Sequence, residues 1–403
     1  MKGRLLVLTS HNIYASTPNG ALHAMRNLMD WLANDWSINI YSLNPCSEPS
    51  PMPRVSVFHA KPLRRKRITI FLNEYFDNLV IRYLRRGFNT VFEYLIRFHK
   101  ESKGNVFRND QHLENLRGFL QGRDYDLVIV EYINNTYLLE AFGDTKPPAI
   151  LDMHDLMHVR AERFREVGIT PSIDIDRMEE YRLMRNYDLL MAIQAKEAGM
   201  LREEFSDRVV VVRRPQQPVD CPLPDDESPF RLLFLASKAL FNLHAYDWFV
   251  SEVWPHLDGD GMELLVAGSL CNVIGRPRRS NIRHLGLVDS LQDAYSLAHV
   301  SINPVQAGSG LKIKNLEALA HGRVMLTTPL GAEGMEDAVG HGLLVVQEPQ
   351  EMVHELQVLR DEPQRRHALG EAGLSYIQEF MSPSACFSEL DQALSRLLSP
   401  DKR

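Results

Sequence analysis

The stretch AGSGLKIKNLEALAHG, at positions 307–322, brings together glycines, lysines and a glutamate in a pattern that could bind an anion. Lys312 and Lys314 stand at the predicted start of a helix, where free backbone N–H groups already carry partial positive charge. Further cations are unfavourable there unless an anion neutralises them. Gly308 and Gly310 would let the backbone approach that anion closely. A diphosphate would satisfy the backbone donors and both lysines.

Glu317 follows on the same predicted helix, at the flank of its apolar stripe. An unpaired carboxylate is costly in that position, and the hydroxyl groups of a ribose would supply hydrogen-bond donors to it. The pattern therefore predicts a nucleoside-diphosphate site. The alternative interpretation is a solvated lysine pair and a surface glutamate after an ordinary glycine loop.

The elements that must position these residues are short apolar runs, which alternate with amphipathic stretches of helical length. The runs before residue 213 are RLLVLTS, SINIYSL, VSVFHA, DLVIVEY, PAILDMH, DLLMAIQ and RVVVV. The runs after residue 230 are RLLFLAS, MELLVAG, NIRHLG, VSINPV, VMLTT and GLLVV. Most are almost continuously apolar, as in parallel strands that are covered on both faces. The alternation predicts an α/β fold of two tandem Rossmann-like domains, with a ligand site in the cleft between them.

A proline-rich segment separates the two sets of strands. Residues 213–230 contain five prolines and no periodicity, which is typical of a linker. The predicted parts are an amino-terminal domain (1–213), a linker (214–230), a carboxyl-terminal nucleotide-binding domain (231–380) and a final helix (381–403). Helical residues are expected to close the chain from about Pro349 onward.

Several ordered motifs resemble one known family. The stretch GSGLKIKNLEALAHGRVMLTTPLGAEGM resembles the nucleotide-sugar motif of the GT-B glycosyltransferases, especially the retaining group called family four. Four further stretches resemble a bacterial branch of that group: LDMHDLMHVRAERFREVG, EEYRLMRNYDLLMAIQAKEAGML, FLASKALFNLHAYDWFVSEVWPHL and NIRHLGLVDSLQDAYSLAHVSINPV. The resemblance covers most of the chain. It implies a GT-B glycosyltransferase that moves a sugar from a nucleotide sugar to a saccharide, lipid-linked or small-molecule acceptor, with retention.

The resemblance also implies roles for single residues. Glu317 would bind the ribose hydroxyls, and Lys312 and Lys314 the diphosphate. The other donor-binding residues would be Gly20, Lys238, Gly308, Ser309, Gly310 and Leu311, and the base would be held at His284, Leu285, Gly286 and Leu287. His154 would lie near the donor sugar, where it positions a sugar or phosphate group. Asp155 is the second candidate catalytic residue, and its alternative role is to cap the helix LMHVRAERFRE.

The chain departs from the family pattern at Ser309. Many family members carry a second glutamate there, eight residues before the ribose-binding one, and it contacts hexose hydroxyls. Because this glutamate is absent, the motif does not indicate which sugar is transferred. Its absence also keeps a second class of function open, namely an epimerase or a nucleotide-sugar-binding protein without transfer activity.

No cofactor and no essential metal are expected. Two short strings resemble the Asp-x-Asp metal-binding motif of the other large glycosyltransferase fold, namely Asp124-Tyr125-Asp126 and Asp174-Ile175-Asp176. Local structure explains them better, the first as a turn before a strand and the second as the polar start of a helix. The cysteines Cys46, Cys221, Cys271 and Cys386 are scattered, so they indicate neither a disulfide framework nor a zinc site.

Charge is distributed unevenly along the chain. The net charge is −7, yet residues 61–123 hold 14 Lys and Arg against 6 Asp and Glu, and eight aromatic residues lie between Phe71 and Phe98. Such a segment could bind an anionic membrane surface, or its arginines could form a solvated face. Nucleic acid is not an expected partner, because no binding motif accompanies the basic residues. We expect a cytoplasmic protein, because the scattered cysteines fit a reducing compartment. Peripheral attachment to the inner face of the membrane is the hypothesis drawn from this segment.

Overall fold

The computed structural model forms two compact units, Met1–Asp152 and Met153–Arg403. It describes residues 2–14, 20–44, 50–61, 107–166, 168, 170–171, 173–226, 229–257, 261–277, 279–308 and 310–399. Most of the basic segment, residues 62–106, lies outside the described residues, as does Ser309. The domain boundaries drawn from the sequence and the cleft between the domains stay predictions.

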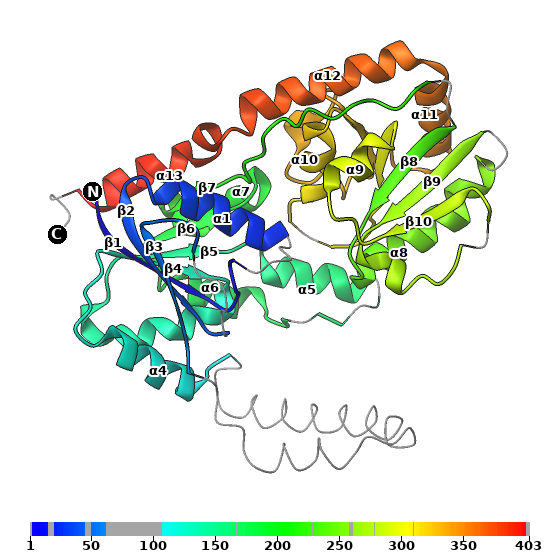
Figure 1. The fold of residues 1–403 in the computed structure, drawn as a ribbon. Coiled ribbons are helices and arrows are strands. Elements are labelled where there is room, and N and C mark those ends of the chain that lie inside the picture. Colours follow the sequence, from blue (N-terminus) through cyan, green and yellow to red (C-terminus); the bar gives the residue numbers. More distant parts are fainter. Residues whose placement is uncertain are drawn as a thin grey trace. The chain divides into compact units, whose positions relative to one another are not determined.

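A seven-stranded sheet occupies the first half of the chain (Figure 1). Its strands are β1 (Gly3–Thr9), β2 (Trp36–Ser42), β3 (Val55–His59), β4 (Leu127–Glu131), β5 (Ala149–Asp152), β6 (Leu189–Ala192) and β7 (Val209–Val211). Their order is β3-β2-β1-β4-β5-β6-β7, and β1 pairs in parallel with both β2 and β4. The buried strand residues are mostly Leu, Ile and Val, as the continuous apolar runs predict.

A six-stranded parallel sheet occupies the second half (Figure 1). Its strands are β8 (Phe230–Leu235), β9 (Met262–Ala267), β10 (Ile282–Gly286), β11 (Val300–Asn303), β12 (Val324–Thr327) and β13 (Leu343–Val345). Their order is β10-β9-β8-β11-β12-β13. All the strands predicted from the sequence are therefore confirmed, and the fold class is the predicted one.

Helices connect most of these strands. They are α1 (Gly20–Leu32), α4 (Asp110–Leu120), α5 (Met157–Glu166), α6 (Arg177–Met184), α7 (Ala195–Phe205), α8 (Leu240–Trp248), α9 (Leu291–Ser296), α10 (Ile313–Ala320), α11 (Pro349–Asp361), α12 (Pro363–Phe380) and α13 (Pro383–Leu397). The predicted helical end of the chain begins at Pro349, as expected. Gly322 adopts φ 66° just after α10, which is the left-handed conformation that ends helices.

Each sheet has a point where the strand order reverses. In the first sheet, β2 and β3 are added on one side of β1, and β4 to β7 follow on the other side, so the strand order reverses between β1 and β4. In the second sheet the order reverses in the same way between β8 and β11. Ligands of open α/β sheets bind outside the carboxyl ends of the strands at such points. The topology therefore predicts ligand sites at the loops after β1 and β4 and at those after β8 and β11.

The described helices include none that combines the length and the apolar character needed to cross a bilayer.

Candidate functional site

The predicted anion site is built as one strand–loop–helix unit, formed by β11, the loop that follows it, and α10. Lys312 is the residue that precedes α10, and its side chain does not cap the helix. Its Nζ instead donates a hydrogen bond of 2.7 Å to the carbonyl of Gly310. Lys312 is only 8% exposed, and burial lowers its pKa to about 8 although the Asp155 carboxylate favours the charged form. The ammonium group of Lys312 is therefore held against the backbone of the glycine loop.

Lys314 occupies a separate environment on the first turn of α10. Its Nζ donates to the Asn242 side-chain oxygen at 2.9 Å and lies 5.0 Å from the centre of the Phe234 ring. Asn242 belongs to α8 and Phe234 to β8, so Lys314 spans the reversal point between β8 and β11. Burial lowers its pKa to about 7, against the favourable charge of Glu317. The two lysines of the motif thus bind different groups, Lys312 a carbonyl of the loop and Lys314 a side chain of α8.

Glu317 is half-buried one turn further along α10. Burial raises its pKa to about 7, and the nearby Lys314 opposes that shift. The sequence predicted that a carboxylate at this flank would be costly, and the raised pKa agrees with that prediction. A ligand that offers hydroxyl donors to Glu317 and negative charge to Lys314 would favour the ionised form of both side chains.

The glycine loop depends on backbone conformations that other residues rarely adopt. Gly308 has φ 120° and Gly310 has φ 71°. A Cβ on Gly310 would lie 1.9 Å from Asp155 Oδ1, whereas a Cβ on Gly308 would have no heavy atom within 4 Å. Leu311, the next predicted contact, is half-buried. The loop and Asp155 are therefore in direct contact.

His154 and Asp155 follow β5 directly, in the turn that leads into α5. His154 is 5% exposed and has φ 61°, a strained conformation for a residue other than glycine. Its Nδ1 lies 2.6 Å from Arg214 Nη2, a hydrogen bond to a residue of the predicted linker. Asp155 Oδ2 accepts from Arg160 at 2.9 Å. Both candidate residues are thus held by arginine.

The alternative role of Asp155 as the cap of α5 is wrong. The amides of Met157 and His158 donate instead to the two carboxylate oxygens of Glu180, each at 2.8 Å. His158 Nδ1 adds a third contact to Glu180 at 2.6 Å, and Glu180 is fully buried. A carboxylate from α6 therefore neutralises the positive end of α5, and Asp155 remains directed at Gly310.

The other predicted donor residues lie at strand or helix ends. Lys238 is exposed in the loop after β8, and its amide donates to Ser269 Oγ at 3.0 Å. His284, Leu285 and Gly286 end β10, and Leu287 is 72% exposed just beyond it. Gly20 is the first residue of α1, in the first unit.

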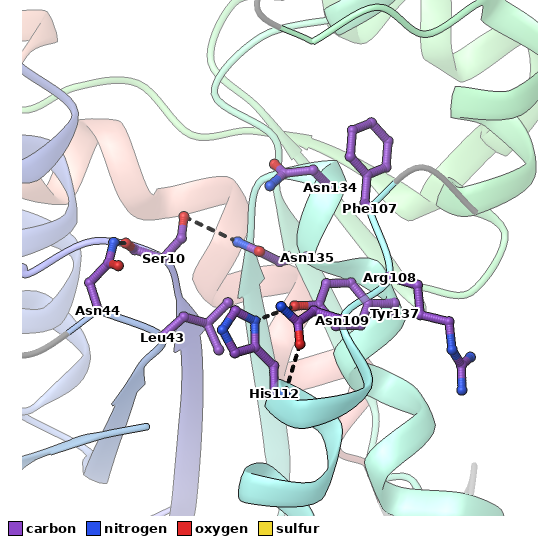
Figure 2. A pocket seen from close by; sticks show the side chains of 10 residues that line it. All are labelled: Ser10, Leu43, Asn44, Phe107, Arg108, Asn109, His112, Asn134, Asn135 and Tyr137. Carbon is purple, nitrogen blue, oxygen red and sulfur yellow. Dashed lines mark hydrogen bonds between the residues drawn. The ribbon is translucent and has the colours of Figure 1, made fainter. Parts of the chain in front are cut away.

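A pocket of about 270 Å³ lies at the reversal point of the first sheet (Figure 2). Its lining consists of Ser10, Leu43, Asn44, Phe107, Arg108, Asn109, His112, Asn134, Asn135 and Tyr137. Figure 2 shows His112 bonded to Tyr137, with a distance of 2.9 Å between Nδ1 and the hydroxyl. Asn135 donates to the carbonyl of Glu131 at 2.7 Å. The walls therefore combine amides, hydroxyls and aromatic rings.

A buried carboxylate that the sequence did not single out lies at the same edge. Glu131 ends β4 with no exposed surface and accepts from Thr9 Oγ1, and His11 Nδ1 lies 3.0 Å away. The hydrogen bond to Glu131 raises the pKa of His11, although burial opposes the shift. Tyr132 follows with φ 62°. Only the pairing of β1 with β4 brings these residues together.

The second aspartate string has the local role that the sequence predicted, because Asp176 caps α6 by accepting from the amide of Glu179 at 2.8 Å. In the first string, Asp126 instead accepts from the amide of Arg4 on β1 at 2.8 Å, a contact between residues 122 positions apart. Among the residues that the structure describes, no cluster of three His, Cys, Asp or Glu side chains could hold a metal ion. Whether activity needs a metal stays a prediction.

Part of the second half of the chain matches a known protein family. Residues 229–361 match the model of the glycosyl transferases group 1 family. This part of the chain is a group 1 glycosyltransferase domain. The matched range contains α10 and the glycine loop, so the predicted family is confirmed for this part of the chain.

The fold of the chain also matches solved structures. Sucrose-phosphate synthase from Thermosynechococcus elongatus has a TM-score of 0.69 and 14% identity, with 98% of this chain and 99% of that chain covered. HepE from Anabaena, in complex with UDP, has a TM-score of 0.64 and 11% identity, with 98% and 100% covered. At these identities the likeness shows the fold, which is GT-B.

One curated protein resembles part of the chain. It is described as an uncharacterized 44.6 kDa protein in the cps region of Klebsiella pneumoniae. The identity is 28% over 116 residues, and the alignment spans 26% of this chain and 30% of that protein.

Proposed function

We propose that the protein transfers a sugar from a nucleoside-diphosphate sugar to a saccharide-containing acceptor. The observation that carries the proposal is the unit of β11, glycine loop and α10, in which Lys312, Lys314 and Glu317 surround the start of a helix. These groups match a nucleoside diphosphate in charge and in hydrogen bonding. A group 1 glycosyltransferase domain spans the same residues.

The chemistry of transfer requires stabilisation of the departing diphosphate. The amides at the start of α10 and the two partly desolvated lysines would do this with charges that are already in place before the reaction. Each such donor is worth about 3 kcal/mol in a site that excludes water. Glu317 would accept hydrogen bonds from the ribose and so fix the position of the diphosphate over the helix.

UDP is the first nucleotide to test. HepE from Anabaena has been solved with UDP and with UDP-glucose, and it shares the fold of this chain. The ends of β10 at His284 to Leu287 would hold the base largely through backbone groups, so the side chains do not select among bases.

The pocket in the first unit is the proposed binding site of the acceptor. It lies at the carboxyl edge of β1 and β4, and four asparagines, a histidine and a tyrosine contribute to its walls. Amide and hydroxyl groups beside an aromatic face suit the hydroxyls and the apolar face of a sugar ring. A saccharide, free or as the head of a lipid-linked acceptor, is therefore the proposed acceptor class.

Retention of the anomeric configuration is part of the proposal and rests on the resemblance to family four. The anomeric configuration of the product, read by NMR from the coupling constant of its anomeric proton, tests it.

Calorimetric titration with UDP, GDP, ADP and dTDP tests the donor site. One of them should bind, and Glu317→Ala should weaken that binding at least tenfold, a loss of about 1.4 kcal/mol. Glu371→Ala is the matched control, because Glu371 is an exposed glutamate on α12. Failure of all four nucleotides to bind would overturn the proposal.

A product assay separates transfer from the two alternatives. A transferase consumes the nucleotide sugar only when an acceptor is present. An epimerase releases a changed nucleotide sugar without any acceptor, and a binding protein gives saturable binding with no product.

A further inference from the structure

Arg163 is a charged residue outside the donor motif that contacts the glycine loop. It projects from α5 and donates from Nη1 to the carbonyl of Gly308 at 3.1 Å. The same guanidinium forms a two-pronged pair with Glu333, at 2.6 Å from Nη1 and 2.9 Å from Nη2. One planar group thus joins α5, the loop after β11 and the loop after β12.

Glu333 is well placed to hold Arg163 still. Its side chain is 9% exposed, and Lys196 of α7 donates to Oε1 at 2.8 Å. Burial disfavours its charged form, but the hydrogen bonds from Arg163 and Lys196 hold the pKa of Glu333 below its ordinary value. The carboxylate therefore stays ionised at neutral pH, and the fork geometry fixes the plane of the guanidinium.

The helix that carries Arg163 is itself anchored to the six-stranded half of the chain. Phe164, the next residue on α5, stacks on Phe241 of α8 with 6.3 Å between ring centres. Asp155, just before α5, lies against Gly310. These contacts leave Arg163 little freedom to swing away from the loop.

A loop with two glycines needs such support. Gly308 and Gly310 both have positive φ, and glycine loses more conformational freedom than any other residue when it is ordered. Electrostatic stabilisation of a leaving group depends on donors that are fixed before the reaction. A loop of this composition would not keep its amides in place without a contact to a rigid neighbour.

We propose that Arg163 is a positioning residue of the donor site. Glu333 and Lys196 fix the guanidinium of Arg163, and Arg163 in turn holds the glycine loop in the conformation that binds the diphosphate. The inference rests on the proposed function for its ligand, but the fixing of the loop can be measured without any ligand. The three side chains are called the loop clamp below.

The test combines hydrogen exchange of the ligand-free protein with calorimetry, on Arg163→Ala, Arg163→Lys, Glu333→Gln and the double variant Arg163→Ala/Glu333→Gln. Arg165→Ala is the matched control, because Arg165 lies on the same helix and pairs with Asp174 away from the loop. In Arg163→Ala the amides of residues 305–308 and 310–312 should exchange at least tenfold faster, and the nucleotide should bind at least tenfold more weakly. The exchange rate and the nucleotide affinity of Arg163→Lys should lie between those of Arg163→Ala and the parent, since lysine keeps the charge but not the two-pronged geometry of the guanidinium.

The loop clamp also predicts how the substitutions combine. Because Glu333 acts through Arg163, the double variant should bind nucleotide no more weakly than Arg163→Ala alone. Effects that add in full would overturn the inference, and so would an exchange rate of the loop in Arg163→Ala equal to that of the parent. Arg163→Lys and Glu333→Gln decide the question if Arg163→Ala does not fold.

The two proposals fail in different ways. If the parent protein binds a nucleotide and Arg163→Ala binds it equally well, the loop clamp is wrong and the proposed function stands. If the parent binds none of the four nucleotides, the proposed function is wrong, and the amide exchange of residues 305–308 and 310–312 still decides whether Arg163 fixes the loop.

Discussion

Asp155 occupies the space that a side chain on Gly310 would need. A Cβ at position 310 would lie 1.9 Å from Asp155 Oδ1 and 3.4 Å from Ile193 Cδ1. The two residues are far apart in sequence, but here a candidate catalytic carboxylate directly contacts the loop of the candidate donor site. A side chain at position 310 is therefore disfavoured for two separate reasons, which are the left-handed backbone conformation and the lack of space for a Cβ.

Gly310→Ala should therefore reduce nucleotide affinity at least tenfold and lower the free energy of unfolding by about 1–3 kcal/mol. The double variant Asp155→Ala/Gly310→Ala should recover part of the stability, because it removes the clash and leaves only the strain at φ 71°. Gly308→Ala is the control: its Cβ meets no neighbour, so Asp155→Ala should not improve it. Equal rescue of both glycine variants in urea unfolding would contradict this account.

Nucleotide affinity should be greatest near neutral pH. The pKa values of Lys314 and Lys312 are lowered to about 7 and about 8, so both lose their charge as the pH rises through those values, and a diphosphate should bind more weakly. The pKa of Glu317 is raised to about 7, so acidification protonates it and removes its capacity to accept from the ribose.

Calorimetry in buffers of different ionisation enthalpy would measure this dependence. Binding near pH 8 should take up protons, because the anionic ligand raises the pKa of the lysines. Lys314→Gln should reduce the proton uptake and flatten the alkaline side of the profile. An affinity that does not change between neutral pH and about pH 9 would show that these lysines do not bind the ligand.

Glu180 should be important for stability and not for chemistry. Glu180→Ala leaves two amides of α5 and His158 without their buried partner, so the free energy of unfolding should fall by about 3 kcal/mol or more. Glu179→Ala is the matched control on the same helix. Its exposed pair with Arg182 should be worth less than about 1 kcal/mol in the same urea titration.

Sugar transfer should proceed without a divalent metal, since Asp126 and Asp176 bind backbone amides. Treatment with EDTA followed by gel filtration should leave the rate of transfer unchanged. Loss of activity that Mn²⁺ restores would refute this prediction.

The basic segment at 61–123 predicts attachment to anionic membranes. Flotation with anionic liposomes should recover the protein, with each Lys or Arg near the surface contributing about 1 kcal/mol. High salt should release it, and so should Arg64→Glu, Arg65→Glu, Lys66→Glu and Arg67→Glu combined. Equal recovery with neutral and anionic vesicles, or none with either, would mean that the arginines form a solvated face.

The strands and the donor motif could be predicted because their signals are local. A continuous apolar run marks a buried parallel strand wherever it occurs, and Pro349 and Gly322 mark helix ends through their own backbone geometry. The motif around Glu317 lies within one strand–loop–helix unit, so residues that are close in the sequence are also close in the folded protein.

The partners of these residues could not be predicted in the same way. Arg163 and Glu333 are 170 residues apart, and Glu131 is 120 residues from His11. Asp155 was a plausible helix cap from its position alone, and only the packing of α6 beside α5 brings in Glu180 instead.

The sequence by itself therefore determined the strands, the helices and the family of residues 229–361, and it proposed the residues that would bind a nucleotide. The tertiary structure alone decided the strand orders, which bring the ends of β1 and β4 and of β8 and β11 together, and the pairing of Arg163 with the glycine loop. The physical reason is that hydrophobic periodicity and backbone preference act between near neighbours in the chain. Ion pairs and hydrogen bonds between elements depend instead on how the chain crosses from one strand to the next.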